Sequence, residues 1–284
     1  MDWHTHQSDR RGFLKWSVSA GAFFAAHSCG FAEPNPVPPK EPVKKSESRI
    51  RRLELLSAAP LADLKEFYHG LLGLQVIEHK PQRLTIKAGQ TRLTFRPATA
   101  DQGMPFYHFA FNIPENKLLK AHEWQRRRTT LLPIPRTLRD PGYPDEVVNY
   151  SHWNAHSVFF FDPAGNVVEY IARHDLKNAV RGDFGPEDIL YASEIAFVVD
   201  DVVTTAGKLK EVAGVESYKG SGDQFAAVGD EHGLLLVMKR GRVISFEAQE
   251  RKAVDVFPTV VAVCGDNLAN YTLPEFPYEL SVEV

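Results

Sequence analysis

Glu169 is the carboxylate whose setting most needs a chemical explanation. It lies within the apolar run Val167–Ile171, and the period of two of a β-strand places it on the same face as Val167 and Ile171. A carboxylate on an apolar face loses its hydration and needs a compensating partner. A bound metal ion is one such partner, and an arginine such as Arg92 is another.

The composition is that of a globular protein with a sizeable core, since the 284 residues are 43% hydrophobic and 24% charged. A formal net charge of -3 offers no basic excess for nucleic acid, so the expected partner is a small molecule. Cys29 and Cys264 are too few for a disulfide framework or a CxxC-type zinc site. Any metal must therefore be held by histidines and carboxylates.

A unit of strand, helix and hairpin recurs along the chain from Arg51. In the first copy, Pro60 can open a helix whose apolar stripe ends at Gly73. In the second copy, Pro114 again precedes a helix, and Asp162–Gly165 has the residues of a type I turn. The expected strands of these two copies are 53–57, 74–78, 83–87 and 91–96, then 107–113, 157–161 and 166–173.

The third copy begins with a strand at 193–199 and a helix capped by Asp200 or Asp201. Its hairpin superimposes on that of the second copy, with Asp230 on Asp162 and Gly233 on Gly165. No fourth copy is evident in the sequence. After Arg242 only two further strands are indicated, at 259–263 and 279–284.

The runs Leu64–Leu74 and Phe161–Glu169 resemble the paired β-α-β-β-β modules of the vicinal oxygen chelate superfamily, the glyoxalase, bleomycin-resistance and extradiol-dioxygenase group. The resemblance implies an α+β fold in which two modules form an eight-stranded cup around a divalent metal. The ligands come from the first and last strands of each module. The implied domains are a two-module unit at 50–178 and, at 189–284, a third module with a C-terminal tail.

The same resemblance places His108 and Glu169 at the two ligand positions of the second module. Glu54 aligns with His108, and Leu93 or Thr94 takes the fourth position, so the implied metal ligands are Glu54, His108 and Glu169, with water completing the shell. One imidazole and two carboxylates suit Mn(II), Fe(II), Ni(II) or Zn(II) and leave positions open for substrate oxygens.

Ordinary structural roles remain open for these residues: Glu54 as a solvated surface charge, and His108 as a hydrogen-bonded core histidine. In the third copy Glu194 aligns with Glu54 and His108, but Val237 aligns with Glu169, so this module lacks half of a ligand pair. The third module is expected to extend the sheet, to cover an edge of the cup, or to pair with a second subunit in a homodimer.

The long polar stretch 129–156 is typical of a functional loop. His156 is a candidate proton shuttle, and Glu169 is a second candidate for the catalytic base. The candidates for lining the substrate cup are Arg136, Arg139, Trp153 and Asn154. Packing and capping explain these residues equally well.

Residues 1–32 resemble a twin-arginine signal peptide, with Arg10-Arg11 ahead of a short apolar run and small residues before position 33. The resemblance implies export to the periplasm in a folded, metal-loaded form. The run is too short to remain as a membrane span. Lipidation of Cys29 is an alternative, although Ala26 stands where lipoprotein signals usually carry Leu. Residues 33–49 hold five prolines and are expected to form a stiff, unpacked spacer.

The functional expectation is an exported, metal-dependent lyase, isomerase or dioxygenase that polarises the vicinal oxygens of a small substrate. Ring cleavage in this superfamily usually uses two His and one Glu, so Glu54 counts against that reaction. The alternative is a small-molecule-binding protein of the resistance type, with no turnover. A third possibility is a structural or interaction protein.

Overall fold

The computed structural model describes residues 47–244, 246, 252–266 and 268–284, which lie within one compact unit, Lys44–Val284. The expected signal peptide (1–32), Cys29 and nearly all of the spacer fall outside the described residues. Within the described part, no helix is both long enough and apolar enough to cross a membrane.

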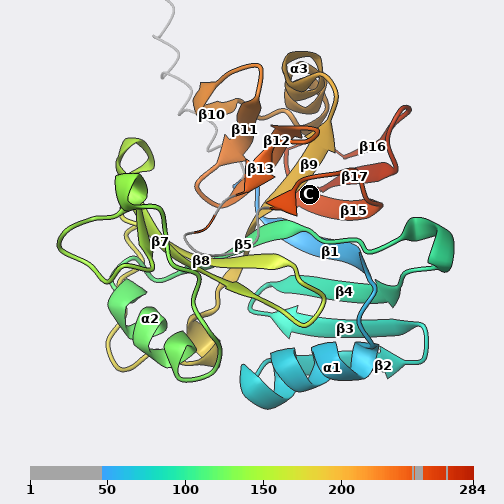
Figure 1. The fold of residues 1–284 in the computed structure, drawn as a ribbon. Helices are drawn as coiled ribbons and strands as arrows, with labels where there is room; N and C mark the ends of the chain where they lie inside the picture. Colours follow the sequence, from blue (N-terminus) through green and yellow to red (C-terminus); the bar gives the residue numbers. More distant parts are fainter. Residues whose placement is uncertain (1–46, 245, 247–251, 267) are drawn as a thin grey trace, which may run out of the picture. The chain divides into compact units, whose positions relative to one another are not determined.

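The first two modules follow the predicted order (Figure 1). Pro60 precedes the first helix, and Gly73, with a φ of 73°, ends it. The first module comprises β1 (Ile50–Ser57), α1 (Leu61–Lys65) with a π-helical turn (Glu66–Leu71), β2 (Gln75–Lys80), β3 (Arg83–Ala88) and β4 (Thr91–Pro97). The second comprises β5 (His108–Ile113), α2 (Leu118–Arg126), β6 (Val147–Tyr150), β7 (Ala155–Phe161) and β8 (Val167–Arg173).

The third module, which the sequence predicted to be partial, is complete, and a reduced fourth module that was not evident in the sequence follows it. Asp201 is the N-cap of the third-module helix, since its side chain accepts a hydrogen bond from the Thr204 backbone N–H at 3.0 Å. The third module comprises β9 (Tyr191–Val199), α3 (Val202–Ala213), β10 (Ser217–Ser221), β11 (Phe225–Asp230) and β12 (Gly233–Lys239). A small pair, β13 (Val243–Ile244) and β14 (Lys252–Ala253), leads to β15 (Thr259–Cys264), β16 (Ala269–Leu273) and β17 (Tyr278–Glu283). Short 3-10 turns lie at Ala100–Gln102, Arg136–Leu138, Ser151–Trp153 and Pro186–Asp188.

Two curled sheets organise these modules. One has eight strands in the order β10-β11-β12-β9-β5-β8-β7-β6, and the other has seven in the order β16-β17-β15-β1-β4-β3-β2. The α+β fold of repeated modules and an eight-stranded sheet made from two modules are therefore confirmed.

The partners within each sheet differ from the expected ones. The second module pairs with the third through antiparallel β5 and β9, while the first pairs with the fourth through β1 and β15. Strand β15 thus lies at the edge of β1 and β9 at the edge of β5, where the sequence implied that β1 and β5 would meet. The predicted pairing of the first two modules within 50–178 is corrected accordingly.

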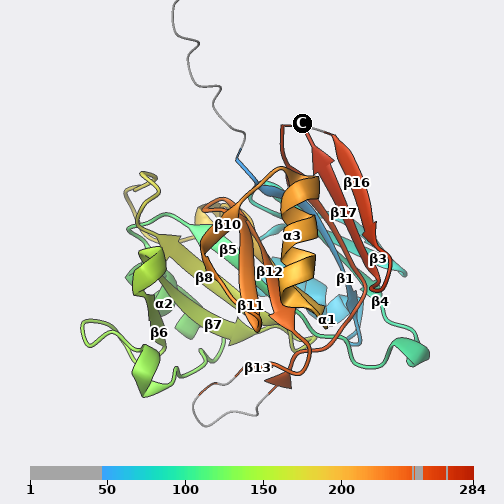
Figure 2. The same cartoon turned by 90° about the horizontal axis from the view of Figure 1, so that it is seen from above.

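The main core lies between the two sheets (Figure 2). It joins residues of the first module to residues of the second and third, for example Leu53 with Phe109 and Phe197. The first helix fills one end, where the rings of Phe67 and Phe160 lie 6.2 Å apart. The opposite face of the eight-stranded sheet, which we call the cup, is free of this core and carries the candidate site.

The end of the expected spacer is packed, not extended away from the domain. Ser48 is buried; its hydroxyl donates to the Gly233 carbonyl at 2.8 Å, and its backbone N–H donates to Asp230 at 3.0 Å. A Cβ at Gly233 would lie 1.6 Å from the Ser48 carbonyl oxygen, so only glycine permits this approach. The chain is thus fixed to the third-module hairpin before β1 begins.

Candidate metal centre

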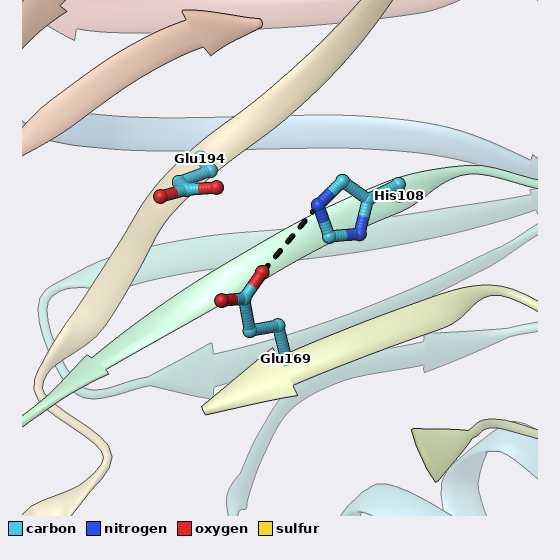
Figure 3. A group of neighbouring side chains, drawn as sticks. All are labelled: His108, Glu169 and Glu194. Atoms are coloured by element: carbon cyan, nitrogen blue, oxygen red, sulfur yellow. Dashed lines mark ion pairs between the residues drawn. The ribbon is translucent and has the colours of Figure 1, made fainter. Parts of the chain in front are cut away.

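His108, Glu169 and Glu194 meet in the cup (Figure 3). One potential ligand atom from each lies within 4.8 Å of the others, and all three residues are buried. They come from three neighbouring strands, β5, β8 and β9. His108 and Glu169 are therefore together as the sequence predicts.

The His108 ring is held in one tautomer. Its Nδ1 lies 3.1 Å from the Val167 carbonyl oxygen, which can only accept, so Nδ1 carries the proton. Burial lowers the pKa of His108 from 6.5 to about 4, so the ring is neutral near pH 7. The lone pair of Nε2 is therefore free and points toward Glu169, whose Oε2 lies 3.5 Å away. A hydrogen bond from the ring nitrogen that does not bind the metal, as Nδ1 makes here to Val167, is the usual way in which proteins orient a metal-binding histidine.

The two carboxylates flank a small residue. Ala110 on β5 is in register with Glu169 on β8 and with Glu194 on β9. Side chains in register share a face, and neighbouring strands lie about 4.8 Å apart. The methyl group of Ala110 thus leaves room between the carboxylates, where a larger side chain would intrude.

Without a cation, burial and mutual repulsion make it energetically unfavourable for Glu169 and Glu194 both to be ionised. Burial, reinforced by the charge of Glu194, raises the pKa of Glu169 well above its usual range. Burial also raises the pKa of Glu194, while the charge of Arg173 opposes the rise. Glu169 Oε1 is buried and has no hydrogen-bond partner among the described residues. An orphaned carboxylate oxygen in a native site calls for an ion, a water or a proton.

Arg173 on β8 is wholly buried beside this group. Its Nη2 forms an ion pair with Glu194 Oε1, and its Nε donates to Asn112 Oδ1 at 3.2 Å. The guanidinium also lies 5.5 Å from the Trp153 ring centroid and 5.7 Å from that of Tyr218. Arg173 thus fixes the position of the Glu194 carboxylate but balances only one of the two negative charges.

These donors suit a divalent metal. Ligand atoms about 2.1 Å from a tetrahedral or octahedral ion lie about 3 to 3.5 Å apart, close to the separation of His108 Nε2 and Glu169 Oε2. A neutral imidazole, two carboxylates and one arginine leave a net negative charge that a dication would reverse. His108, Glu169 and Glu194 would hold the ion, which would supply Lewis acidity and bind substrate oxygens at its open positions.

The fourth strand of the site provides no ligand. Leu234 and Leu236 on β12 face the cup together with Ala196, whereas Val237 belongs to the core on the other face. Leu236, in register with Ala196, takes the place that a second carboxylate would occupy. The third module therefore brings Glu194 to the site, which corrects the expectation of a purely structural role, and Leu236, not Val237, is the counterpart of Glu169.

Glu54 lies in the other sheet and takes no part in this group. Its carboxylate forms ion pairs with Arg96 on the neighbouring strand β4, at 3.0 Å, and with Arg83 on β3, one strand further, at 2.6 Å. Two arginines thus occupy the space where a cation would lie. Because the second module pairs with the third, Glu194 occupies the position beside His108 and Glu169 that the sequence implied for Glu54.

His156 lies on the opposite face of β7 from the cup. On this strand Phe159 is in register with Glu169, and Ser157 with Ile171, so His156, which directly precedes Ser157, points to the other face. His156 instead joins a chain of polar contacts, with Asp140 at 3.1 Å and His174 at 2.9 Å. Its predicted role as a proton shuttle is not supported by this placement.

The predicted lining residues divide in the same way. Trp153 is buried in the cup beside Arg173, as expected. Asn154 is exposed and donates to Asp175 at 2.7 Å. Arg139 is tied to the Ile134 carbonyl and to Asp145, and Arg136 lies in an exposed 3-10 turn. Arg173 and Tyr218 line the cup but were not predicted, since an arginine at a strand end and a tyrosine on an edge strand carry no distinctive motif.

Described residues of the segment that links the third and fourth modules cover part of the cup. Phe246 packs on Phe159 with a centroid separation of 5.5 Å, and Val254 joins the apolar cluster that contains Ala110 and Ile171. A cavity of about 10 Å³ remains beside His108. The site is therefore enclosed, and a substrate would have to displace part of this cover.

The comparisons with known proteins concern the fold. No family model matches the sequence, and no curated protein matches it. Among solved structures, a dioxygenase-type protein from Bacillus subtilis has 16% identity and a TM-score of 0.53, over 84% of this chain and 86% of that one. Glyoxalase I from Zea mays has 13% identity and a TM-score of 0.47, over 83% and 92% of the two chains. The first of these likenesses shows that the chain has the vicinal oxygen chelate fold.

Proposed function

We propose that the protein is a metal-dependent enzyme of the glyoxalase and dioxygenase type, acting on a small substrate with vicinal oxygens. The observation that carries this proposal is the buried group of His108, Glu169 and Glu194, in which Glu169 Oε1 has no partner among the described residues. The likeness to the Bacillus subtilis dioxygenase-type protein supports the same class of chemistry. The metal is Mn, Fe, Ni or Zn by the chemistry of the donors.

The roles of the chain's own groups follow from their positions. His108 and the two glutamates would hold the metal, and Arg173 keeps Glu194 in place through their ion pair. Glu169 is the candidate group to exchange a proton with a bound substrate, because it would lie at the metal beside the substrate oxygens. The apolar cover excludes water from the site and strengthens every charge interaction within it.

Metal content tests the proposal directly. Elemental mass spectrometry of wild type, H108A, E169Q and E194Q is compared with that of E54Q, the matched control in the other sheet. We expect about one metal per chain in wild type and E54Q and none in the other three variants. A folded wild type without metal, or a loss of metal only in E54Q, would overturn the metal centre.

A binding protein of the same fold is the second candidate. The apolar cover over the cup and the cavity of about 10 Å³ favour it, since both leave little room for turnover. Metal-loaded protein is assayed by calorimetry and for turnover against catechols and thiol adducts of 2-oxoaldehydes. Binding without turnover supports the second candidate, and turnover lost in E169Q supports the enzyme.

We also propose that residues 1–32 direct export to the periplasm through the twin-arginine route, on the strength of Arg10-Arg11 and the apolar run that follows. Cell fractionation of wild type and R10K/R11K tests this proposal. Retention of the folded double variant in the cytoplasm is the expected result. A C29S variant that loses membrane association would instead support lipid anchoring.

A further inference from the structure

The outer edge of β16 is open where a further strand belongs. In the other modules the position beside the third strand is filled, as β2 fills it beside β3 and β10 beside β11. The fourth module has only β15, β17 and β16, so β16 forms the margin of the seven-stranded sheet. No described strand pairs with that margin, and both views show it at the rim of the sheet (Figures 1 and 2).

The three other edges of the two large sheets carry features that discourage pairing. Strand β2 has a register break between Val76 and Glu78 and a charged end at Lys80. Strand β10 pairs irregularly with β11 and contains Lys219 at a φ of 39°. Val148 of strand β6 forms an isolated antiparallel β-bridge with Arg139. Charges, bulges and covering loops are the usual protections of edge strands.

Strand β16 has none of these protections. Its sequence, Ala-Asn-Tyr-Thr-Leu, is uncharged, and Tyr and Thr favour strands. Asn270 and Thr272 are exposed on one face, while Leu273 is buried on the other. Leu268, just before the strand, is 77% exposed. The edge therefore presents free backbone groups with an apolar side chain beside them.

We propose that β16 pairs antiparallel with β16 of a second copy of this chain, about a two-fold axis at Tyr271. This register places Asn270 opposite the partner's Thr272 and Ala269 opposite the partner's Leu273. Polar side chains then meet polar ones, and apolar side chains meet apolar ones, on each face. A self-complementary edge of this kind generates a closed two-fold dimer. The two seven-stranded sheets become one sheet across the interface.

Charge placement tests the register. In the variant N270K/T272K each lysine would face a lysine of the partner, whereas in N270E/T272K each lysine would face a glutamate. Both variants share T272K, which lies opposite Glu279 within the chain, so their folded monomers are closely matched. Sedimentation equilibrium of the full chain over a range of concentrations measures dimerisation.

We expect wild type and N270E/T272K to dimerise, and the dissociation constant of N270K/T272K to rise by at least about tenfold. Metal content serves as a separate readout and should not change, because β16 and the metal centre lie in different sheets. A monomeric wild type overturns the proposal. Equal dimerisation, or equal dissociation, of both variants also overturns it.

Discussion

Glu169 and Glu194 point toward one another across β5, each in register with Ala110, and only one of them has an arginine partner. The space between the carboxylates therefore depends on the size of residue 110. A cation in that space would bind both carboxylates. Without a cation, the same arrangement places two buried acceptors side by side.

Ala110→Val should reduce metal affinity by about tenfold or more, because its added methyl groups enter the space between the two carboxylates. The measurement is competition with a chelator for a titrated divalent metal. Ala196→Val is the control, since it adds the same volume on the same face, two residues from Glu194. Equal losses in both variants would indicate general overpacking of the cup instead of a blocked ligand gap.

Glu169→Gln should stabilise the metal-free protein while abolishing metal binding. Glutamine has nearly the same shape but no charge, so it removes the cost of a buried carboxylate next to Glu194. We expect a gain of about 1 to 3 kcal/mol in the free energy of unfolding near pH 7 to 8, measured with urea in the presence of chelator. A less stable E169Q under these conditions would mean that the carboxylate has a favourable partner in the metal-free fold.

Arg173→Met should destabilise the fold by about 3 kcal/mol or more, because it leaves Glu194 buried without its ion-pair partner. The double variant R173M/E194L removes both charges and should recover most of that loss. Denaturant unfolding of the metal-free proteins gives both values. If the double variant is as unstable as the single one, the destabilisation comes from lost packing of the arginine on Trp153 and Tyr218 and not from the charge.

The modules could be predicted from the sequence, but the way in which they pair could not. Turn residues and apolar periodicity mark each unit locally, as Pro60, Gly73 and the turn at Asp162 do. The partner of β1 is β15, about two hundred residues away, in a module without a helix. The sequence of an alternating apolar strand of this kind does not indicate which other strand it will pair with.

The same limit explains the one displaced ligand. Glu54 and Glu194 occupy equivalent positions in their modules, so alignment alone cannot choose between them. The choice depends on which module pairs with the second. In the seven-stranded sheet β3 and β4 bring Arg83 and Arg96 to Glu54, whereas in the eight-stranded sheet Glu194 lies with Glu169 and His108. His108 and Glu169 were predictable because both belong to one module.

His108 gives the metal-free protein a pH dependence of definite sign. Its pKa is about 4 when folded and about 6.5 in the unfolded chain, so between these values the unfolded chain binds the proton that the folded site refuses. The stability from neutral His108 is complete above pH 6.5 and is lost as the pH falls toward 4. Relative to H108N, whose amide can still donate to Val167, wild type should lose about 3 kcal/mol of unfolding free energy between about pH 7 and pH 4.

Imidazole NMR shifts provide the independent check. In chelated wild-type protein the His108 ring should remain neutral, with its proton on Nδ1, at pH values near the ordinary histidine pKa of about 6.5. A His108 ring that titrates near 6.5 would show that the cup admits water. In that case burial would not keep Nε2 unprotonated, and the ring would lose its advantage as a metal ligand near neutral pH.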